Sequence, residues 1–335
     1  MSDKKHLLPQ VDRYFKANLH THSNISDGML SREELKKLYK DKGYQILSIT
    51  DHNIIADHSD MNEDDFLMLT GTEVNINEPD MDRFTGKTYH LNLLAKRPDN
   101  LWSPLKKFGR FPQAAEYEEK TQHEEMDVQH NPESINAMIA KANEKGFLVT
   151  YNHPVASCHS YPDYAPLRGL WGVELRNSDS YYFSNNEDNF NIFRELRNFG
   201  NNVFPIGADD THADVMVGGA WIMVGAKELT YDSVIDALEN GDLYMSCGPE
   251  IHSVYVEGNK LKVTCSDARK VCMLTHGRFA RSVLAKDGPI QSAEFDLTYF
   301  LNGTKDDPNA YVCVMVIDQN GNYAVTPAYY LKELL

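Results

Sequence analysis

The chain has 335 residues, of which 41% are hydrophobic and 24% are charged, a balance that is typical of a globular protein. This length accommodates one large domain and a smaller one. The formal net charge of −16 argues against stable nucleic-acid binding, which needs a basic surface to displace counterions from phosphates. No apolar run is long enough to cross a bilayer, so no membrane association is expected.

Two further features indicate the cellular compartment. The N-terminus has no sustained apolar stretch of the kind that a secretory signal needs, which favours a cytoplasmic protein if the chain has not been trimmed. The five cysteines form no Cys-x-x-Cys pair, which favours free, mostly buried thiols in a reducing compartment. A single disulfide between Cys265 and Cys313 is the alternative.

The first predicted strand, over residues 14–19, runs into His20 and His22. Side chains two residues apart point to the same side of an extended backbone, so both imidazoles can bind one metal ion. Asp27 follows five residues after His22 and can join them from the next loop. Alone, a His-x-His pattern is as often a histidine without a ligand role.

The pattern recurs along the chain, because further short apolar runs end in residues that bind metals. Those runs span residues 45–50, 66–69, 147–151 and 203–206, and a further strand-like segment spans residues 88–94. The candidate ligands that these segments present are Asp51, His52, Glu73, His90, His153, Asp209, Asp210 and His212. Chance does not explain so many metal-binding residues at strand ends, so the pattern predicts a polynuclear metal site.

These motifs together resemble the PHP (polymerase and histidinol phosphatase) family of phosphoesterases. The resemblance covers roughly residues 14–250 and rests on His20-x-His22-Ser23 with Ser26-Asp27-Gly28, Thr50-Asp51-His52-Asn53, Gly71-Thr72-Glu73, His90, Asn152-His153-Pro154 and Asp210-Thr211-His212. It implies an α/β fold, namely a distorted seven-stranded β/α (TIM-like) barrel that holds two or three divalent metal ions and cleaves phosphoesters.

The resemblance also implies which residues share each ion. His20, His22, Glu73 and Asp210 would hold the first, with Glu73 bridging to a second that is held by His90 and His153, and Asp27, His52 and His212 would hold a third. We expect Glu73, Asp210, Asp51 and His153 to serve catalysis, with Asp51 as a hydrogen-bonded orienter of a histidine rather than a ligand. Asp209 is an extra carboxylate, and the Asp-x-His spacing favours Asp210 as the ligand.

The remaining segments predict a barrel domain over residues 1–250 and a small β-sandwich over residues 251–335. A capping box at Ser31 begins one helix, and apolar periodicity predicts others over residues 132–145, 186–199 and 231–240. Residues 96–131 are polar without a strand pattern and indicate a solvated insertion, with a lid as its candidate role. His58 is expected to be a solvated loop histidine, and His123, His252 and His276 are likewise not expected to bind metal.

The C-terminal segment has short alternating strands separated by turns. Tyr311, two residues before Cys313, resembles an immunoglobulin-like tyrosine corner, so the sandwich is predicted to be immunoglobulin-like. The core tryptophan that such domains often carry is absent.

Six imidazoles and three carboxylates favour Zn, Mn or Fe over Mg or Ca. We therefore predict a metal-dependent phosphoesterase in which a hydroxide between the metals attacks a phosphomonoester or phosphodiester. Expected substrates are small phosphorylated molecules: a nucleotide, an oligonucleotide end or a metabolite phosphate. Two alternatives remain, a metal-dependent amidohydrolase and a non-catalytic interaction protein that keeps the metals for structure.

Overall fold

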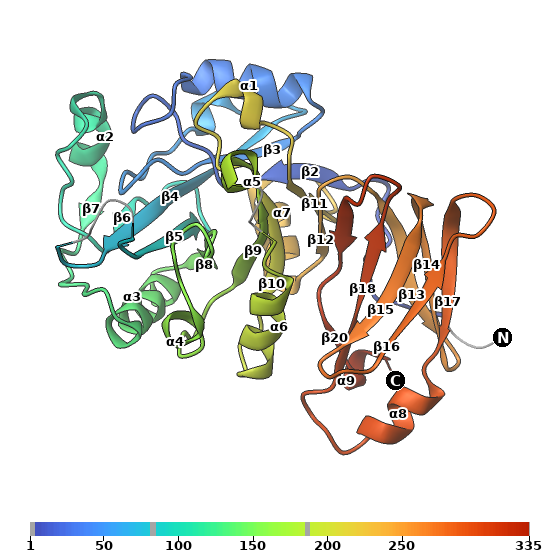
Figure 1. Cartoon of the computed structure of the whole chain (residues 1–335). Helices are drawn as coiled ribbons and strands as arrows, with labels where there is room; N and C mark the ends of the chain where they lie inside the picture. Colours follow the sequence, from blue (N-terminus) through green and yellow to red (C-terminus); the bar gives the residue numbers. More distant parts are fainter. Residues whose placement is uncertain (1–3, 81–84, 185–187, 335) are drawn as a thin grey trace.

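The fold is described from a computed structural model, which covers residues 4–80, 85–184 and 188–334 (Figure 1). Its larger part is built on seven neighbouring strands whose order is β10-β9-β8-β5-β4-β3-β2. Their bounds are β2 (Phe15–Asn18), β3 (Ile46–Ile49), β4 (Leu67–Asn77), β5 (Thr88–Ala95), β8 (Phe147–Tyr151), β9 (Gly172–Asn177) and β10 (Phe204–Ala208). All are mostly buried, as expected for strands that are covered on both faces.

The seven strands form a mixed sheet, because β5 runs antiparallel to both β4 and β8 while the other pairs are parallel. Just beyond β2 and β10, an isolated parallel bridge joins Thr21 to Thr211. The backbone hydrogen bond from His22 N to Thr211 O measures 3.0 Å, and that from Asp210 N to His20 O measures 2.9 Å. These contacts join the first and last strands at the end where the predicted ligands lie. Strands β2 and β10 themselves form no ladder in the described part of the chain, so the closed barrel stays a prediction.

Helices surround this sheet (Figure 1). They are α1 (Arg32–Asp41), α3 (Pro132–Glu144), α4 (Tyr161–Tyr164), α5 (Ser178–Ser184), α6 (Phe190–Asn198) and α7 (Tyr231–Asn240), with single turns η1 (Ser59–Met61) and η3 (Asp214–Met216). The predicted capping box at Ser31 is confirmed. Gly241 ends α7 in the left-handed conformation with φ 75°, which glycine adopts without a Cβ penalty. The predicted helix 186–199 is observed over Phe190–Asn198, and residues 186 and 187 lie outside the described residues.

The insertion over residues 96–131 contains more structure than its sequence predicts. It holds β6 (Trp102–Ser103) and β7 (Gln122–His123), which pair in parallel, together with η2 (Pro112–Ala114) and α2 (Ala115–Lys120). Phe111 and Tyr117 pack against a small apolar cluster of Ile25, Ile54 and Ala114. The insertion therefore rests on the two loops that follow β2 and β3.

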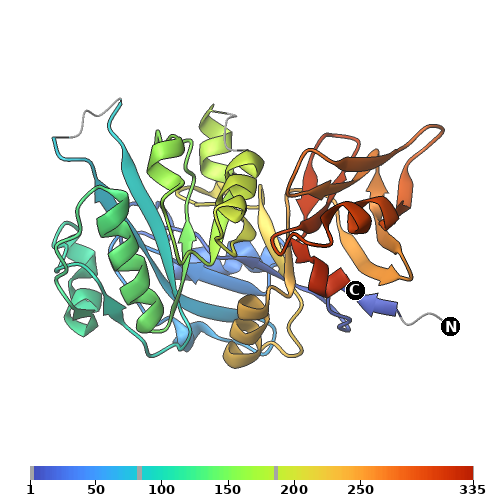
Figure 2. The ribbon, with the colours of Figure 1, turned by 90° about the horizontal axis from the view of Figure 1, so that it is seen from below.

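The C-terminal part contains two antiparallel sheets and a separate apolar core, so the predicted β-rich segment is confirmed (Figure 2). One sheet has β1 (Lys4–His6), β13 (Ile251–Glu257), β14 (Lys260–Ala268) and β17 (Ile290–Asp296). The other contains β15 (Lys270–Thr275), β16 (Ala280–Leu284), β18 (Tyr311–Ile317), β19 (Tyr323–Val325) and β20 (Tyr329–Tyr330). Two short helices, α8 (Thr298–Thr304) and α9 (Leu331–Leu334), complete it.

The tyrosine-corner interpretation is not supported by the contacts of Tyr311. Its buried hydroxyl has no hydrogen-bond partner among the described residues, whereas a tyrosine corner requires a bond to upstream backbone. The immunoglobulin-like assignment therefore stays a prediction. All five cysteines are free, so Cys265 and Cys313 form no disulfide.

The two parts share backbone hydrogen bonds. Strand β11 (Trp221–Val224) pairs with β2 and with β12 (Leu243–Ser246), and β12 also pairs with β19. One sheet thus continues from the larger part into the C-terminal part, and β1 at the start of the chain pairs with β13. The division at residue 250 remains a proposal. None of the described helices combines the length and apolar character needed to span a membrane.

Candidate metal centre

The structure brings all nine predicted ligands together at one end of the seven strands. His20 and His22 follow β2, His52 follows β3, His153 follows β8, and Asp210 and His212 follow β10. Glu73 lies within β4 and His90 within β5, while Asp27 comes from the loop after β2. Parallel strands present their carboxyl ends at one edge of a sheet, which explains why distant segments converge here.

The innermost group contains His20, His22, Glu73 and Asp210, all of them buried. Nε2 of His20 lies 3.2 Å from Glu73 Oε1 and 3.1 Å from Asp210 Oδ1, and Nε2 of His22 lies 3.0 Å from the same Asp210 oxygen. The two Nε2 atoms are 3.2 Å apart. Ligands at about 2.1 Å from one ion are separated by roughly 3.0–3.4 Å, so these distances match the edges of a coordination polyhedron.

An outer group is formed by His22, Asp27, His52 and His212. The Asp27 carboxylate lies 3.7 Å from His22 Nδ1, 3.4 Å from His52 Nε2 and 3.6 Å from His212 Nε2. The side chain of Asp27 is 43% exposed, whereas that of Glu73 is 1% exposed. The centre is therefore open to solvent on the Asp27 side and closed at Glu73.

The Glu73 carboxylate connects the groups. Its Oε2 lies 3.1 Å from His52 Nδ1, and its Oε1 lies 3.1 Å from His90 Nδ1 and 3.3 Å from His153 Nε2. His153 Nε2 is also 3.3 Å from His90 Nδ1. This central position suits the bridging carboxylate that the resemblance implies. The grouping differs in detail, because His22 and His52 each contribute to two groups.

The contacts of the donor atoms fit bound metal ions. Several buried donor atoms have no hydrogen-bond partner among the described residues, namely Nδ1 of His22 and of His52, Oε2 of Glu73 and Oδ1 of Asp210. Leaving such atoms unpaired costs free energy unless another ligand satisfies them. A divalent cation accepts their lone pairs directly, and a mixed imidazole and carboxylate set suits Zn, Mn or Fe.

The charges around the imidazoles also favour bound cations. Burial alone lowers the pKa of His22, but the adjacent carboxylates of Asp210 and Glu73 outweigh it and raise the pKa to about 10. For His153, burial is again outweighed, chiefly by its hydrogen bond to Glu73, and the pKa rises to about 9. Although burial acts to raise it, the neighbouring histidines hold the pKa of the Glu73 carboxyl well below its usual range. The carboxylates thus stabilise positive charge here, which metal ions would supply.

A residue that the sequence analysis missed is Glu174 on β9. It is fully buried, and its Oε1 lies 2.7 Å from Nδ1 of His20. Its Oε2 accepts hydrogen bonds from the backbone N of His153 and the side chain of Asn177, both at 2.9 Å. The available signal was a single carboxylate within the apolar run 170–175. A carboxylate behind a ligand histidine orients the ring and fixes its tautomer.

Asp51 does not orient a histidine, in contrast to the prediction. Its carboxylate accepts hydrogen bonds from the backbone N and the hydroxyl of both Ser23 and Ser26, at 2.5–3.2 Å. These bonds hold the loop that leads to Asp27. Asp209 also has a structural role, because its carboxylate accepts hydrogen bonds from the backbone of Gly218, Gly219 and Ala220.

Three residues at the centre have left-handed backbone conformations, namely Asn53 with φ 56°, His153 with φ 23° and Asp210 with φ 51°. Non-glycine residues rarely adopt positive φ, and the conformation costs about 1–3 kcal/mol. The surrounding hydrogen bonds, such as those of Asp210 N and His153 N, hold this geometry. The strain thus falls on two of the predicted ligands.

Exposed cationic and apolar side chains occur on the insertion and on loops that adjoin predicted ligands along the chain. Lys106 and Arg110, on the insertion segment before Phe111, are exposed and form no ion pair with a described carboxylate. Gln113 of the same insertion donates a 3.4 Å hydrogen bond to the Ser26 carbonyl, next to Asp27. Met29 and Val215 are 76% and 60% exposed. They lie close along the chain to Asp27 and His212.

The histidines that were not expected to bind metal lie outside the three groups. His58 is nevertheless buried, which corrects the expectation of a solvated loop residue. Its Nδ1 lies 3.5 Å from Arg32 Nη1, and its ring packs against Tyr117 of the insertion.

Comparison with known protein families gives a match for part of the chain. Residues 18–148 match the PHP domain. The resemblance to the PHP family is thus confirmed for this segment, which contains the ligands from His20 to His90, while His153, Asp210 and His212 lie beyond it. No curated protein matches the chain in sequence.

Several solved structures align with the chain at TM-scores below 0.5. A two-domain protein from Bacteroides vulgatus, described as containing a predicted PHP-like metal-dependent phosphoesterase, is 13% identical with a TM-score of 0.41, over 98% of each chain. An amidohydrolase from Chromobacterium violaceum is 16% identical over 59% of this chain and 87% of its own, with a TM-score of 0.38. A lesion-specific endonuclease from Pyrococcus furiosus is 12% identical over 68% of this chain and 56% of its own, with a TM-score of 0.38. These overall similarities are too low to transfer a function.

Proposed function

We propose that this protein is a metal-dependent phosphoesterase whose active site is the candidate metal centre. The observation that carries the proposal is the buried Glu73 carboxylate, which lies within 3.1–3.3 Å of a ring nitrogen of each of five histidines. Such an arrangement suits a carboxylate that bridges two cations. The PHP domain match over residues 18–148 supports the phosphoester class.

We further propose two or three divalent ions of the Zn, Mn or Fe type, in a barrel of seven strands closed through Thr21 and Thr211. When bound, such ions polarise the phosphoryl oxygens and activate a water molecule for attack on phosphorus. The protein itself positions the ligands of these ions. Glu174 holds the proton on Nδ1 of His20, so that Nε2 directs its lone pair into the centre. Asp51 keeps the Ser23–Ser26 segment folded, which places Asp27 at the open side.

We propose a small phosphorylated substrate, such as a nucleotide, an oligonucleotide end or a metabolite phosphate. The insertion that rests on the loops after β2 and β3 carries Lys106 and Arg110, and we propose that these exposed cations attract the anionic substrate in a protein whose net charge is −16. Exposed Met29 and Val215 can contact its organic part. The substrate would enter on the side of Asp27, where the centre is open.

The amidohydrolase alternative is less well supported. Such barrels usually have a strand-borne lysine that bridges the metals, and no lysine is buried among the described residues. The non-catalytic alternative keeps the same metal centre but has no turnover. Both alternatives give results that differ from those of a phosphoesterase in the same assay.

The test is hydrolysis by the full chain reconstituted with Zn, Mn or Fe, assayed on a generic phosphomonoester, a generic phosphodiester and a set of amides. We expect phosphoester cleavage that Glu73→Gln lowers at least 100-fold with the fold retained. His252→Gln serves as a control, because His252 is 52% exposed and pairs only with Glu250. Amide cleavage alone would favour the amidohydrolase. A metal-loaded chain without turnover on any compound would favour the non-catalytic protein.

A further inference from the structure

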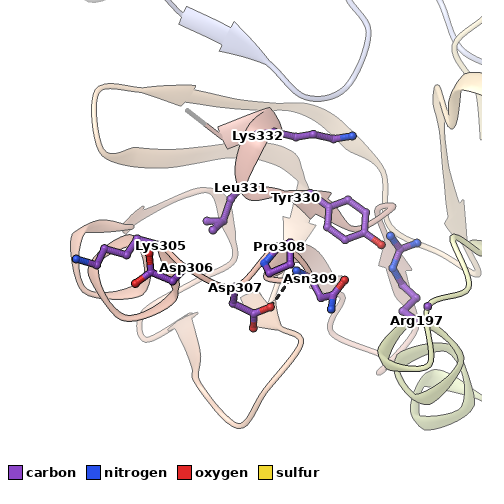
Figure 3. A pocket seen from close by; sticks show the side chains of 10 residues that line it. Arg197, Lys305, Asp306, Asp307, Pro308, Asn309, Tyr330, Leu331 and Lys332 are labelled. Atoms are coloured by element: carbon purple, nitrogen blue, oxygen red, sulfur yellow. Dashed lines mark hydrogen bonds between the residues drawn. The ribbon is translucent and has the colours of Figure 1, made fainter.

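A second cavity lies away from the metal centre, where α6 of the larger part meets the C-terminal segment (Figure 3). Its volume is about 540 Å³. The side chains that line it include Arg197, Lys305, Asp307, Asn309, Tyr330 and Lys332. None of the predicted metal ligands lines it, so any ligand bound here would be separate from the substrate.

Arg197, in the last turn of α6, is the most unusual residue of this cavity. It is only 4% exposed, yet it forms no ion pair with any carboxylate in the described part of the chain. Its Nη1 donates to the carbonyl of Val203, its Nη2 donates to Asn202 Oδ1 at 3.0 Å, and its Nε has no partner. A guanidinium has five N–H donors, so most of its capacity is unused.

Two aromatic rings partly compensate the positive charge of Arg197. The guanidinium carbon of Arg197 lies 5.2 Å from the centre of the Tyr311 ring and 5.1 Å from that of Tyr330. Such cation–π contacts stabilise a cation less than the loss of its hydration destabilises it on burial. The buried charge of Arg197 is therefore only partly compensated by the protein, and an anionic ligand could neutralise it.

The other charges of the cavity divide between its two ends. Lys332 and Tyr330 lie on the side of Arg197, whereas Lys305 and Asp306 lie at the opposite side (Figure 3). Neither lysine has an ion-pair partner among the described residues. Asp307 is already engaged, because its Oδ2 lies 3.2 Å from His276 Nε2 and its Oδ1 accepts from Asn309 N at 2.9 Å. The side near Arg197 is thus positive without a bound carboxylate.

We propose that this cavity binds a small anion, through a carboxylate or phosphate group held between Arg197 and Lys332. The planar guanidinium offers paired donors that match either group, and the ring of Tyr330 can pack against the organic part of the ligand. Arg197 belongs to α6 and Lys332 to α9, so the anion connects the two parts of the protein. This proposal is independent of the catalytic one, because it requires no metal and no turnover.

Thermal unfolding of the full chain tests this proposal, with inorganic phosphate, sulfate and citrate as probes. We expect phosphate or citrate to raise Tm by roughly 2 °C at ten times its Kd. Lys332→Ala and Arg197→Lys should weaken binding at least threefold, and Arg197→Met should abolish it. Arg197→Lys and Lys332→Ala keep the proposal testable if Arg197→Met does not fold. A stronger effect of citrate identifies a carboxylate ligand, whereas a stronger effect of phosphate or sulfate identifies a phosphate ligand.

Two controls separate this cavity from other anion sites. Lys286→Ala, at an exposed lysine elsewhere in the C-terminal part, should leave the anion effect unchanged. His52→Asn alters the metal centre and should also leave it unchanged. The proposal is overturned if no anion raises Tm, if the Arg197 and Lys332 variants respond like the parent chain, or if His52→Asn abolishes the effect.

Discussion

Glu174 Oε1 lies 2.7 Å from Nδ1 of His20, and both side chains are buried. The carboxylate accepts the Nδ1 proton, which leaves Nε2 of His20 free to face Glu73 and Asp210. Because Glu174 also accepts from the backbone N of His153, one residue positions two of the predicted ligands. Variants of Glu174 therefore test whether residues behind the predicted ligands are needed for metal binding.

We expect Glu174→Ala to lower both metal affinity and kcat by about 10–100-fold, because supporting residues of metal ligands have effects of this size. Glu174→Gln keeps an acceptor and should lose less. Metal titration and steady-state kinetics measure both quantities. Glu195→Ala is the control, since Glu195 contacts Tyr164 instead of the centre. Parent-like metal affinity in Glu174→Ala would contradict the assigned role.

Removal of metal should destabilise the fold. Chelation leaves the buried carboxylates of Glu73 and Asp210 without their cations, and ligand binding to the native state alone raises its stability. We expect Tm to fall by several degrees after dialysis against a chelator and to recover with Zn or Mn. Metal analysis should give two to three equivalents in the loaded chain. Identical Tm values for the loaded and chelated protein would count against bound metal in the native state.

The proposed role of Lys106 and Arg110 predicts an effect on substrate binding. Arg110→Ala, alone or with Lys106→Ala, should raise KM about three- to tenfold and change kcat less than twofold, because neither side chain is placed among the ligands. The KM effect should shrink at high salt, since exposed charges are screened. Arg13→Ala provides a matched control, because Arg13 is also exposed and precedes β2, at the end of the strand away from the ligands. An equal loss in kcat would assign Arg110 to the chemical step instead.

His159 predicts part of the pH dependence of stability. Burial, with smaller effects of neighbouring His130 and Lys87, lowers the pKa of His159 to about 3 despite the nearby Asp163. The unfolded chain, with a pKa near the usual 6.5, then binds more protons than the folded chain between about pH 6.5 and pH 3. Stability therefore falls as the pH falls through this window, by up to about 1.4 kcal/mol per pH unit from this group.

Urea unfolding at several pH values between 7.5 and 4.5 measures this effect. His159→Phe removes the titrating group, and its free energy of unfolding should depend less on pH than that of the parent chain. The comparison of the two slopes isolates His159 from the carboxylates of the centre. Parallel slopes would show that His159 is protonated in the folded state as readily as in the unfolded one.

The 1–250 fragment tests the proposed division of the chain. It lacks β13 and β19, so β1 and one edge of β12 lose their partners, and we expect lower solubility and a lower Tm. If soluble, it should bind metal normally and hydrolyse a small generic phosphoester at a rate near that of the full chain. A metal-loaded but inactive fragment would mean that the C-terminal part supplies a catalytic group, with Arg278 and Arg281 as the first candidates.

Most of the predicted ligands could be read from the sequence because they follow or lie within a short apolar run, and strands of the sheet bring such positions to one edge. His20, Glu73 and His212 are examples of this local signal. The role of Glu174 could not be predicted, because it depends on the contact with the ring of His20, which lies far away in the sequence. The partners of Asp51 and the burial of His58 likewise depend on how loops pack.

The C-terminal part shows the same limit. Its strands were predicted from alternation and turns, whereas the unpaired hydroxyl of Tyr311 overturned the tyrosine-corner interpretation. The pairing of β12 with β19 and that of β1 with β13 join segments far apart in the chain. Local sequence patterns carry no information on such partners, so the continuity between the two parts became visible only in the structure.

The pairing of Lys4 with Glu257 and of His6 with Tyr255 has a consequence for biosynthesis. The ribosome synthesises β1 well before β13, because all seven strands of the larger part lie between the two in the chain. Until then Leu8, which packs in the C-terminal core, has no apolar surroundings of its own. The nascent chain must therefore carry β1 unpaired and exposed until β13 has been synthesised, which is the period when chaperones would shield it.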